Sequence, residues 1–414
     1  MEPQADVLIV GAGAAGLNAA WYLQQAGKKV LVLEAASVEG GRLATDREAG
    51  FMFDHGFQVL QTAYPELNRK DGPVRLESLN LRRFFPGALV FHQGRRFLFA
   101  DPLRQPAALG LTLLNPLAGF GDKWKTLKLR NKLLRGTVAD CFSDDVENSL
   151  DYLLRLGFSE NYIQHFFRPF MQGIFLDDPA RVSASMFRFV FRAFSAGDAA
   201  VPETGMAALP NAMRQALKPG TVITGANVVR ATAHSLETAD GKHWEAKQVL
   251  LTTNHETLLQ QDIPALNRNW QSVLNFYFAA DENPVRRPVL CLNPDPEALI
   301  GNFCFISDVA PAYAPQGKHL LSCTHTGGKS WSEELEKSVR QEMAALLGLK
   351  TEQLTPLKHY AIAHALPEQH RVSDAPRLLQ SSNGIWLAGD ALANSSLNAA
   401  LRSGRLAAES MLQA

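Results

Sequence analysis

Residues 6–34 read DVLIVGAGAAGLNAAWYLQQAGKKVLVLE, and this stretch decides the fold. It begins with a short, continuous apolar run, which is typical of a buried parallel strand. Gly11, Gly13 and Gly16 follow, and a helical stretch then leads to a second apolar run that ends on Glu34. A strand, glycines, a helix, a strand and an acid in this order predict a βαβ unit that binds a dinucleotide.

The spacing of the glycines has a physical reason at each position. The first permits a tight turn, the second lets the backbone approach a pyrophosphate, and the third lets the helix pack closely on the strand. The helix N-terminus presents N–H groups and a partial positive charge to the phosphates. Glu34 can accept hydrogen bonds from the ribose hydroxyls and would repel the 2′-phosphate of NADP. The residues expected to bind the dinucleotide are Gly11, Gly13, Ala14, Ala15, Gly16, Glu34 and Ala35.

A second glycine pair, Gly40 and Gly41, follows Glu34 after a few residues, and Arg42 comes next. The pair lets the chain turn back over the dinucleotide. The guanidinium of Arg42 is a planar, permanently charged donor for phosphate oxygens. A domain that binds NAD has no use for this second device, so the sequence favours FAD.

The C-terminal part of the chain contains a matching pattern. Residues 384–390 read GIWLAGD, an apolar strand that ends in Gly389 and Asp390, and SSLNAA at 395–400 precedes a helical stretch. Together with the N-terminal motifs, this pattern resembles the flavin-containing amine oxidase superfamily, which includes monoamine and polyamine oxidases, protoporphyrinogen oxidases and phytoene-type carotenoid desaturases. The resemblance implies an α/β fold, with a Rossmann-like FAD-binding domain of the GR2 type and an interleaved α+β substrate domain.

The resemblance also implies roles for individual residues. The motif at 40–42 would contact the FAD phosphates and ribityl chain, and Asp390 would hold a ribityl hydroxyl. A helix that begins near Asn398 and Ala399 would direct its positive end at the flavin N1/C2 carbonyl region. The implied neighbours of the isoalloxazine ring are Gly56, Phe57 and Gln58, and the backbone of Val228 is implied to pair with adenine. From the residues alone, a turn or N-cap role for Asp390 and an ordinary strand role for Val228 stay open.

Composition limits the classes of partner and cofactor. Lys plus Arg equals Asp plus Glu at 41 each, so the net charge of zero gives no reason to expect nucleic acid. The four cysteines form no CxxC pair or cluster with metal-ligand spacing, so we expect no metal. None lies near Asp390, where some members of the superfamily attach FAD, so we expect non-covalent FAD. Without a signal segment or a long apolar run, the chain is expected in the cytoplasm or at the periphery of the inner membrane.

The FAD-binding stretches are far apart in the sequence, so two insertions must separate them. We expect a discontinuous FAD-binding domain formed by residues 1–76, 199–261 and 366–414. Residues 77–198 have mainly helical periodicity and would form the first substrate-domain insertion. Residues 262–365 contain runs of β-branched and aromatic residues between proline-bearing turns, which predict an antiparallel sheet as the second insertion.

The substrate is less well defined than the cofactor. Residues 166–175 read FFRPFMQGIF, which resembles a stretch common to desaturases and protoporphyrinogen oxidases, and both insertions contain many phenylalanines. These features favour dehydrogenation of a C–C or C–N bond in an apolar small molecule (a polyene, a porphyrinogen or an amine) by hydride transfer to flavin N5, with oxygen or a quinone as electron acceptor. The alternative for the phenylalanines is that they simply fill a core. The alternatives for the function are an isomerase without net oxidation and a flavin-binding protein without catalysis. No side chain is identifiable as catalytic.

Residues 123–135 read KWKTLKLRNKLLR and carry six basic side chains and no acid. Such a stretch could lie on an anionic membrane as a peripheral contact and admit a lipophilic substrate. The alternative is a solvated helix whose basic face balances acids elsewhere in the protein.

Overall fold

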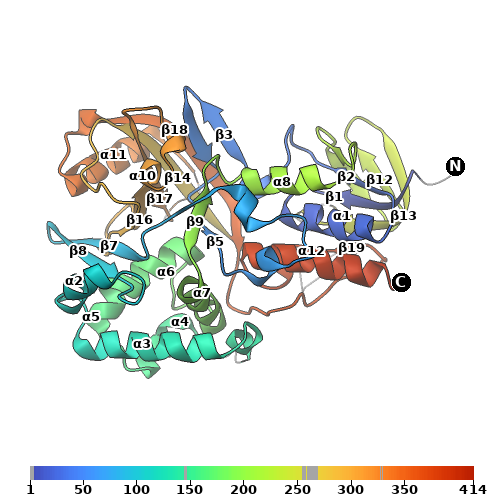
Figure 1. The fold of residues 1–414 in the computed structure, drawn as a ribbon. Helices are drawn as coiled ribbons and strands as arrows, with labels where there is room; N and C mark the ends of the chain where they lie inside the picture. Colours follow the sequence, from blue (N-terminus) through green and yellow to red (C-terminus); the bar gives the residue numbers. More distant parts are fainter. Residues whose placement is uncertain (1–3, 144–146, 254–257, 259–268, 327, 329) are drawn as a thin grey trace.

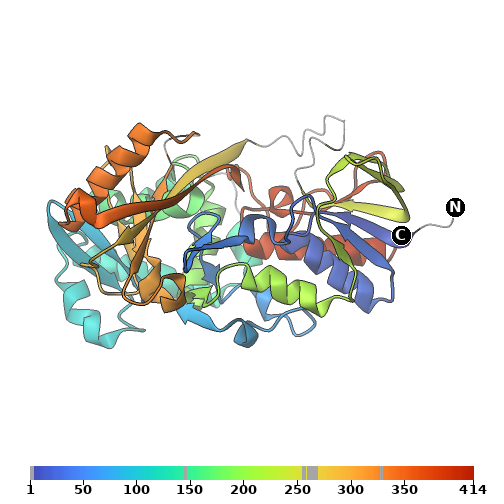
Figure 2. The ribbon, with the colours of Figure 1, turned by 90° about the horizontal axis from the view of Figure 1, so that it is seen from above.

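The computed structural model is built around two large sheets at opposite ends of the molecule (Figures 1 and 2). It confirms the expected mixed α/β fold. The described residues are 4–143, 147–253, 258, 269–326, 328 and 330–414. Within these ranges, we find no helix with the length and apolar character needed to cross a membrane.

The first large sheet contains the predicted βαβ unit. Its strand order is β10-β2-β1-β13-β12-β11, and β19 pairs with β13. The strands are β1 (Ala5–Val10), β2 (Val30–Leu33), β10 (Val222–Ile223), β11 (Val228–Ala231), β12 (Ser235–Thr238), β13 (His243–Leu251) and β19 (Trp386–Leu387). β1 is parallel to both of its neighbours, β2 and β13, and β19 is parallel to β13. Parallel pairing therefore brings the beginning, the middle and the end of the chain to one sheet.

Two helices pack against each other beside this sheet, α1 (Ala14–Gln25) and α12 (Leu397–Met411). They lie close together at Gly404, where a Cβ atom would lie 2.2 Å from the carbonyl oxygen of Ala15. Nδ2 of Asn18 donates a hydrogen bond of 2.7 Å to the carbonyl of Leu401. The absence of a side chain at Gly404 thus lets the C-terminal helix lie directly on the helix of the glycine motif.

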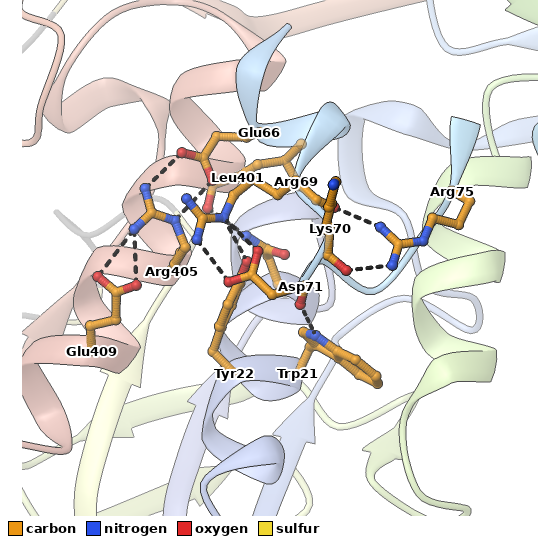
Figure 3. A network of polar contacts seen from close by, with 11 residues as sticks. Trp21, Tyr22, Glu66, Arg69, Lys70, Asp71, Arg75, Leu401, Arg405 and Glu409 are labelled. Carbon is orange, nitrogen blue, oxygen red and sulfur yellow. Dashed lines mark hydrogen bonds and ion pairs between the residues drawn. The ribbon is translucent and has the colours of Figure 1, made fainter. Parts of the chain in front are cut away.

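An ionic network holds the segment that follows β5 (Leu60–Gln61) against α12, as Figure 3 shows. The guanidinium of Arg405 donates to Glu66 at 2.7 and 3.0 Å and to Glu409 at 2.9 and 3.1 Å. The side chains of Arg405 and Glu66 are only 11% and 6% exposed, so their charges are largely shielded from water. Beside this network, Arg69 donates a hydrogen bond of 3.1 Å to the hydroxyl of Tyr22 on α1.

The second large sheet has the order β18-β14-β17-β16-β15-β7-β8. Its strands are β7 (Gly87–His92), β8 (Arg95–Ala100), β14 (Trp270–Ala280), β15 (Leu290–Leu292), β16 (Asn302–Phe305), β17 (His319–His325) and β18 (Leu354–Pro367). The helix α11 (Glu333–Leu347) covers one face, where Val339 and Met343 share a buried cluster with Phe276 and Phe278. The hairpin of β7 and β8 lies in a region whose pattern is mainly helical, and β7 joins this sheet by parallel pairing with β15.

The remaining elements lie between and around the two large sheets. The hairpin of β3 (Thr45–Glu48) and β4 (Phe51–Asp54) and the small sheet of β5, β9 (Ala199–Pro202) and β6 (Leu81–Arg83) lie between them (Figure 1). The helices are α2 (Leu109–Leu113), α3 (Phe120–Arg135), α4 (Ser149–Arg155), α5 (Glu160–Tyr162), α6 (Arg168–Phe175), α7 (Ala184–Ala196), α8 (Ala208–Ala216) and α10 (Ile306–Val309). All of these except α8 and α10 follow one another between β8 and β9.

Candidate active site

A continuous cavity of about 1340 Å³ runs from the glycine loop after β1 to the helix α3. Its lining includes residues at the ends of β1, β13 and β14, and side chains from α3, α6 and α7. A large cavity that collects residues from several elements is the usual position of a cofactor and substrate site.

The glycine loop forms one end of this cavity. Gly11 has φ +99°, a conformation that favours glycine. A Cβ atom on Gly16 would lie 2.0 Å from the carbonyl oxygen of Gly11, whereas a Cβ atom on Gly13 would have no atom within 4 Å. Gly13 lines the cavity, so its open side is available to a phosphate group at the N-terminus of α1. The loop therefore fits the pyrophosphate of a dinucleotide.

Glu34, at the end of β2, holds the same loop from the other side. Its Oε2 accepts a hydrogen bond from the N–H of Ala12 at 2.7 Å, and its Oε1 accepts one from Ala36 at 2.9 Å. Glu34 also lines the cavity. The carbonyl of Glu34 accepts from the N–H of Ala226 at 2.8 Å, which places Val228 two residues from this contact.

Arg42 and Asp390 form a bidentate ion pair at the cavity although they are 348 residues apart. Nη2 of Arg42 donates to Oδ1 at 2.6 Å, and Nη1 donates to Oδ2 and to the carbonyl of Ala365, both at 2.9 Å. The Asp390 side chain is 6% exposed and that of Arg42 is 42% exposed. The guanidinium also lies 5.8 Å from the ring centroid of Trp270. The structure thus joins the two motifs that the sequence assigns separately to the cofactor.

The segment from His55 to Gln58 lines the cavity between its two ends. Nε2 of Gln58 donates to the carbonyl of Arg42 and, at 3.0 Å, to that of His55, which ties the segment to the second glycine motif. Gly56 has φ +91°, and a Cβ atom there would lie 3.0 Å from the side chain of Ile362. The backbone geometry of this segment therefore depends on a glycine where β18 comes close.

Asp54, at the end of β4, anchors this segment from inside the protein. Its Oδ1 accepts from the hydroxyl of Thr45 at 2.5 Å and from the N–H of Met206 at 2.9 Å. Its Oδ2 accepts from the hydroxyl of Tyr313 at 2.6 Å, and its carbonyl accepts from Tyr277 at 2.9 Å. Burial raises the pKa of Asp54 above its usual range, although these donors favour the charged form. Because the carboxyl group is surrounded by donors, it fixes the strand end from which the cavity segment begins.

His55 is held by a group of polar side chains beside the cavity. Its Nε2 lies 3.3 Å from Oδ1 of Asp46, and its ring lies 4.7 Å from that of Tyr360. The hydroxyl of Tyr360 donates to Asp46 at 2.7 Å. Lys358, whose Nζ lies 3.6 Å from Asp46, belongs to this group but does not line the cavity.

The N-terminus of α12 faces the same cavity. Ser396 caps the helix, because its Oγ accepts from the N–H of Ala399 at 3.0 Å, and Ser396, Leu397 and Ala400 line the cavity. The positive end of the helix dipole therefore points to this space. Asn398 is buried, and its Oδ1 accepts from the N–H of Glu66 at 3.0 Å.

Most of the residues expected at the cofactor line this one cavity: Gly11, Gly13, Ala14, Ala15, Glu34, Gly40, Gly41, Arg42, Gly56, Phe57, Gln58, Gly389 and Asp390. The others do not line it: Gly16, Ala35, Val228, Asn398 and Ala399. The lining also contains Thr252, Trp270 and His364, which the sequence did not single out. Thr252 directly follows β13, and a residue at the end of a parallel strand beside β1 is a signal that could have identified it.

A comparison with families of known proteins agrees with this geometry. The model of the family of flavin-containing amine oxidoreductases matches residues 14–412. The chain belongs to this family. It is therefore an oxidoreductase with FAD as its cofactor, and the glycine loop, Glu34 and the open side of Gly13 fit the dinucleotide part of that cofactor.

Individual relatives of this flavin-containing amine oxidoreductase match over shorter stretches. The 15-cis-phytoene desaturase of Arabidopsis thaliana is 43% identical over 105 residues, which is 24% of this chain and 19% of that protein. Protoporphyrinogen oxidase 2 of the same plant is 26% identical over 181 residues, 43% of this chain and 34% of that protein. The matches thus span no more than 34% of the length of these two relatives. The crystal structure of a putative protoporphyrinogen oxidase from Exiguobacterium sp. 255-15 covers 99% of both chains with a TM-score of 0.71 and 20% identity, which shows the shared fold.

The half of the cavity farther from the glycine loop is lined mainly by apolar side chains, and we call it the aromatic half. The aromatic lining residues of this half are Phe99, Phe120, Trp124, Tyr162, Phe166, Phe170, Phe191 and Phe194. Phe166 belongs to a π-helical turn (Ile163–Phe167) that precedes α6, and such turns are frequent at functional sites. Three cationic lining side chains are already engaged: Arg104 binds Asp198, Lys123 donates to backbone carbonyls, and Nε of Arg130 lies 3.9 Å from Oδ2 of Asp101.

Proposed function

We propose that this FAD-dependent oxidoreductase dehydrogenates a C–C or C–N bond of an apolar small molecule, such as a polyene, a porphyrinogen or an amine. The observation that carries the proposal is the aromatic lining of the cavity beyond segment 55–58. Removing apolar ligand surface from water contributes about 25 cal/mol per Å², so such a lining favours a ligand of low polarity. The names of the desaturase and the protoporphyrinogen oxidase among the relatives support this substrate class.

The residues of the chain divide into groups with different tasks in this proposal. Gly13 and the N-terminus of α1 would hold the pyrophosphate, and Glu34 the adenosine ribose. Arg42 and Asp390 would fix the ribityl chain, and segment 56–58 would lie beside the flavin ring. The backbone of Val228 would pair with adenine. When bound, FAD accepts a hydride at N5 and passes the electrons to oxygen or a quinone.

The protein contributes orientation and electrostatics to this chemistry. The positive end of α12 favours negative charge in the part of the cavity near Leu397. The aromatic side chains exclude water from the reacting bond and hold the substrate against the ring. Because the four cysteines are buried and do not line the cavity, we propose that FAD is bound without a covalent link. Burial also raises the pKa of Cys141 to about 11, which makes this thiol unreactive.

Anaerobic mixing of the purified holoprotein with candidate substrates tests the proposal. Bleaching of the oxidised flavin absorbance by a polyene, a porphyrinogen or an amine supports dehydrogenation and identifies the class. Turnover that occurs only after chemical reduction of the flavin would instead indicate an isomerase. A holoprotein that responds to no substrate in either redox state would indicate a flavin-binding protein without catalysis.

Two variants in α7 connect the response to the cavity. Phe191 lines the cavity, whereas Phe187 is buried behind it and packs on Tyr152. We expect Phe191→Ala to raise the KM for the substrate, because it removes a contact surface. Phe187→Ala should lower stability without this change in KM. Equal effects of both variants on KM would contradict the assignment of the substrate to the aromatic half.

A further inference from the structure

Exposed apolar side chains are concentrated in one short part of the chain. Of the twelve large hydrophobic side chains that are exposed among the described residues, seven lie between positions 103 and 124. They are Leu103, Leu109, Leu111, Leu113, Leu114, Phe120 and Trp124, which we call the apolar rim. Leu114, Phe120 and Trp124 are 83%, 73% and 63% exposed. Exposed apolar side chains that gather in one region are typical of an interaction surface.

Most of the apolar rim lies along the large cavity. Leu103, Leu109, Leu113, Phe120 and Trp124 line the cavity and are also exposed to solvent. The rim therefore lies at an opening that leads to the aromatic half. In Figure 1, α2 and α3 lie at the outer edge of the molecule, on the side away from β1 and α1. A molecule that enters here meets mainly apolar side chains from the surface to the interior.

Basic side chains extend this surface along α3. Lys128, Lys132 and Arg135 are exposed and follow Phe120 and Trp124 along one side of the helix. The only acid from position 102 to position 135 is Asp122, which is buried and binds Ser159. The exposed face of α3 thus changes from aromatic at its N-terminal end to cationic at its C-terminal end.

A second, shallower hollow of about 440 Å³ borders the rim on its other side. Leu111 and Leu114 line it together with three arginines, Arg95, Arg96 and Arg287, and it has no acidic lining residue. All three arginines are exposed. Since the net charge of the whole chain is zero, the positive charge on both sides of the rim is a local feature and not a property of the protein as a whole.

We infer that the apolar rim inserts into an anionic phospholipid bilayer, with the cationic groups of α3 and of the arginine hollow on the headgroups. The apolar side chains would enter the acyl boundary, which is how an interfacial surface binds without spanning the membrane. Anionic headgroups complement the two cationic flanks. The inference deepens the proposed function, because an apolar substrate dissolved in the bilayer would enter the cavity without crossing water.

A second copy of this chain fits the surface less well. Two copies that met rim to rim would bring their cationic flanks together, and like charges at an interface oppose association. An anionic surface removes this repulsion. Self-association is nevertheless a measurable outcome, and it would replace the inference.

Flotation of the FAD-loaded protein with vesicles tests the inference, with phosphatidylcholine alone and with phosphatidylglycerol added. We expect binding to the anionic vesicles that weakens with added salt, because the electrostatic part is screened. The variant Lys128→Gln/Lys132→Gln/Arg135→Gln should bind roughly 100-fold more weakly, since each basic group near an anionic surface contributes about fivefold. Leu111→Gln/Leu114→Gln should also bind at least tenfold more weakly, and these two leucines do not line the large cavity.

Matched control variants exclude general effects of charge and polarity. Lys28→Gln/Lys218→Gln/Lys337→Gln removes the same charge from exposed positions elsewhere, and Leu154→Gln/Leu412→Gln removes two other exposed leucines. Both controls should bind vesicles like the parent protein. The inference would be overturned if the control variants weakened vesicle binding as much as the rim variants do. It would also be overturned if the parent protein did not bind anionic vesicles. A third contrary outcome is a dimer of the parent protein in solution that dissociates in the variant Leu111→Gln/Leu114→Gln but not in the controls.

The vesicle experiment is independent of the reaction. It needs no substrate and no electron acceptor, so its failure leaves flavin bleaching by a detergent-dispersed substrate unaffected. Conversely, a holoprotein that binds anionic vesicles but bleaches with no substrate would contradict the proposed function and leave the docking surface in place.

Discussion

The ion pair between Arg42 and Asp390 predicts a measurable coupling between two distant parts of the chain. Asp390→Asn removes the charge of a carboxylate that is 6% exposed and accepts two hydrogen bonds from Arg42. Hydrogen bonds to charged groups contribute about 1.5–3 kcal/mol, whereas fully exposed ion pairs contribute less than about 1 kcal/mol. Because the Arg42 side chain is 42% exposed, water replaces part of the lost contact. We therefore expect a loss near the lower limit, about 1.5 kcal/mol.

A double-mutant cycle on the FAD-free protein measures this coupling. The free energy of unfolding in urea is compared for the parent protein, Arg42→Gln, Asp390→Asn and the double variant. Each single variant should lose about 1.5 kcal/mol, and the double variant should lose little more, because either substitution already breaks the pair. The exposed pair of Arg82 and Glu203 serves as a control with a coupling below about 1 kcal/mol.

The same variants connect the pair to the cofactor. Both residues line the cavity, so Asp390→Asn should weaken FAD binding by about tenfold, which corresponds to about 1.4 kcal/mol. Fluorescence titration of the FAD-free variants measures this change, and the Arg82 control should bind FAD like the parent. Two results together would refute the view that this pair joins the two cofactor motifs. The losses of unfolding free energy of the single variants would add in full in the double variant, and the FAD affinity would be unchanged.

Three further predictions concern the frame around the site. Gly16→Ala should fail to fold, because its Cβ would lie 2.0 Å from a backbone carbonyl oxygen. Gly13→Ala should fold but lose FAD affinity. Circular dichroism measures folding and FAD titration measures the affinity, so the two assays distinguish the variants. Arg405→Leu leaves a buried carboxylate unpaired and should lower the free energy of unfolding in urea by about 3 kcal/mol, and a loss below about 0.5 kcal/mol would contradict this. Burial raises the pKa of Asp122, but its hydrogen bonds outweigh this effect and bring the pKa below 3.8. The charged carboxylate therefore stabilises the folded protein above pH 3.8, and this contribution is lost as the pH falls through the pKa of the folded state. Asp122→Asn should therefore make urea stability less dependent on acid below about pH 4, and an unchanged dependence would argue against this role.

The geometry of the glycine loop could be predicted because its determinants are local, whereas its role in binding the nucleotide stays a prediction. Gly11, Gly13 and Gly16 act through backbone geometry within a few residues, and Glu34 ends the next strand. The start of α12 was also predictable, since Ser396 caps the helix near the expected Asn398. In each case the residue type and its neighbours in the sequence contain the physical reason for the structure.

Other parts of the site depend on contacts that no local pattern contains. The pairing of Arg42 with Asp390 requires that β1 and β19 belong to the same sheet. No pattern in the sequence shows which strands lie in one sheet or how they are aligned. Trp270 and His364 come to the cavity only because β14 pairs with β18. The hairpin of β7 and β8 was not expected in 77–198, because short strands surrounded by helical periodicity do not stand out. The division into domains at the expected boundaries stays a prediction.

The two halves of the cavity differ in what determines their shape. The end at the glycine loop is constrained by close backbone contacts, since a single methyl group at Gly16 or Gly404 would meet a carbonyl oxygen at 2.0 or 2.2 Å. The aromatic half is formed by side chains such as Phe170 and Phe194, which can change without moving the backbone. The same fold at 20% identity over 99% of both chains is consistent with this difference. Cofactor motifs therefore identify the family but carry no information on the substrate, which has to be inferred from the aromatic lining and the surface where it opens.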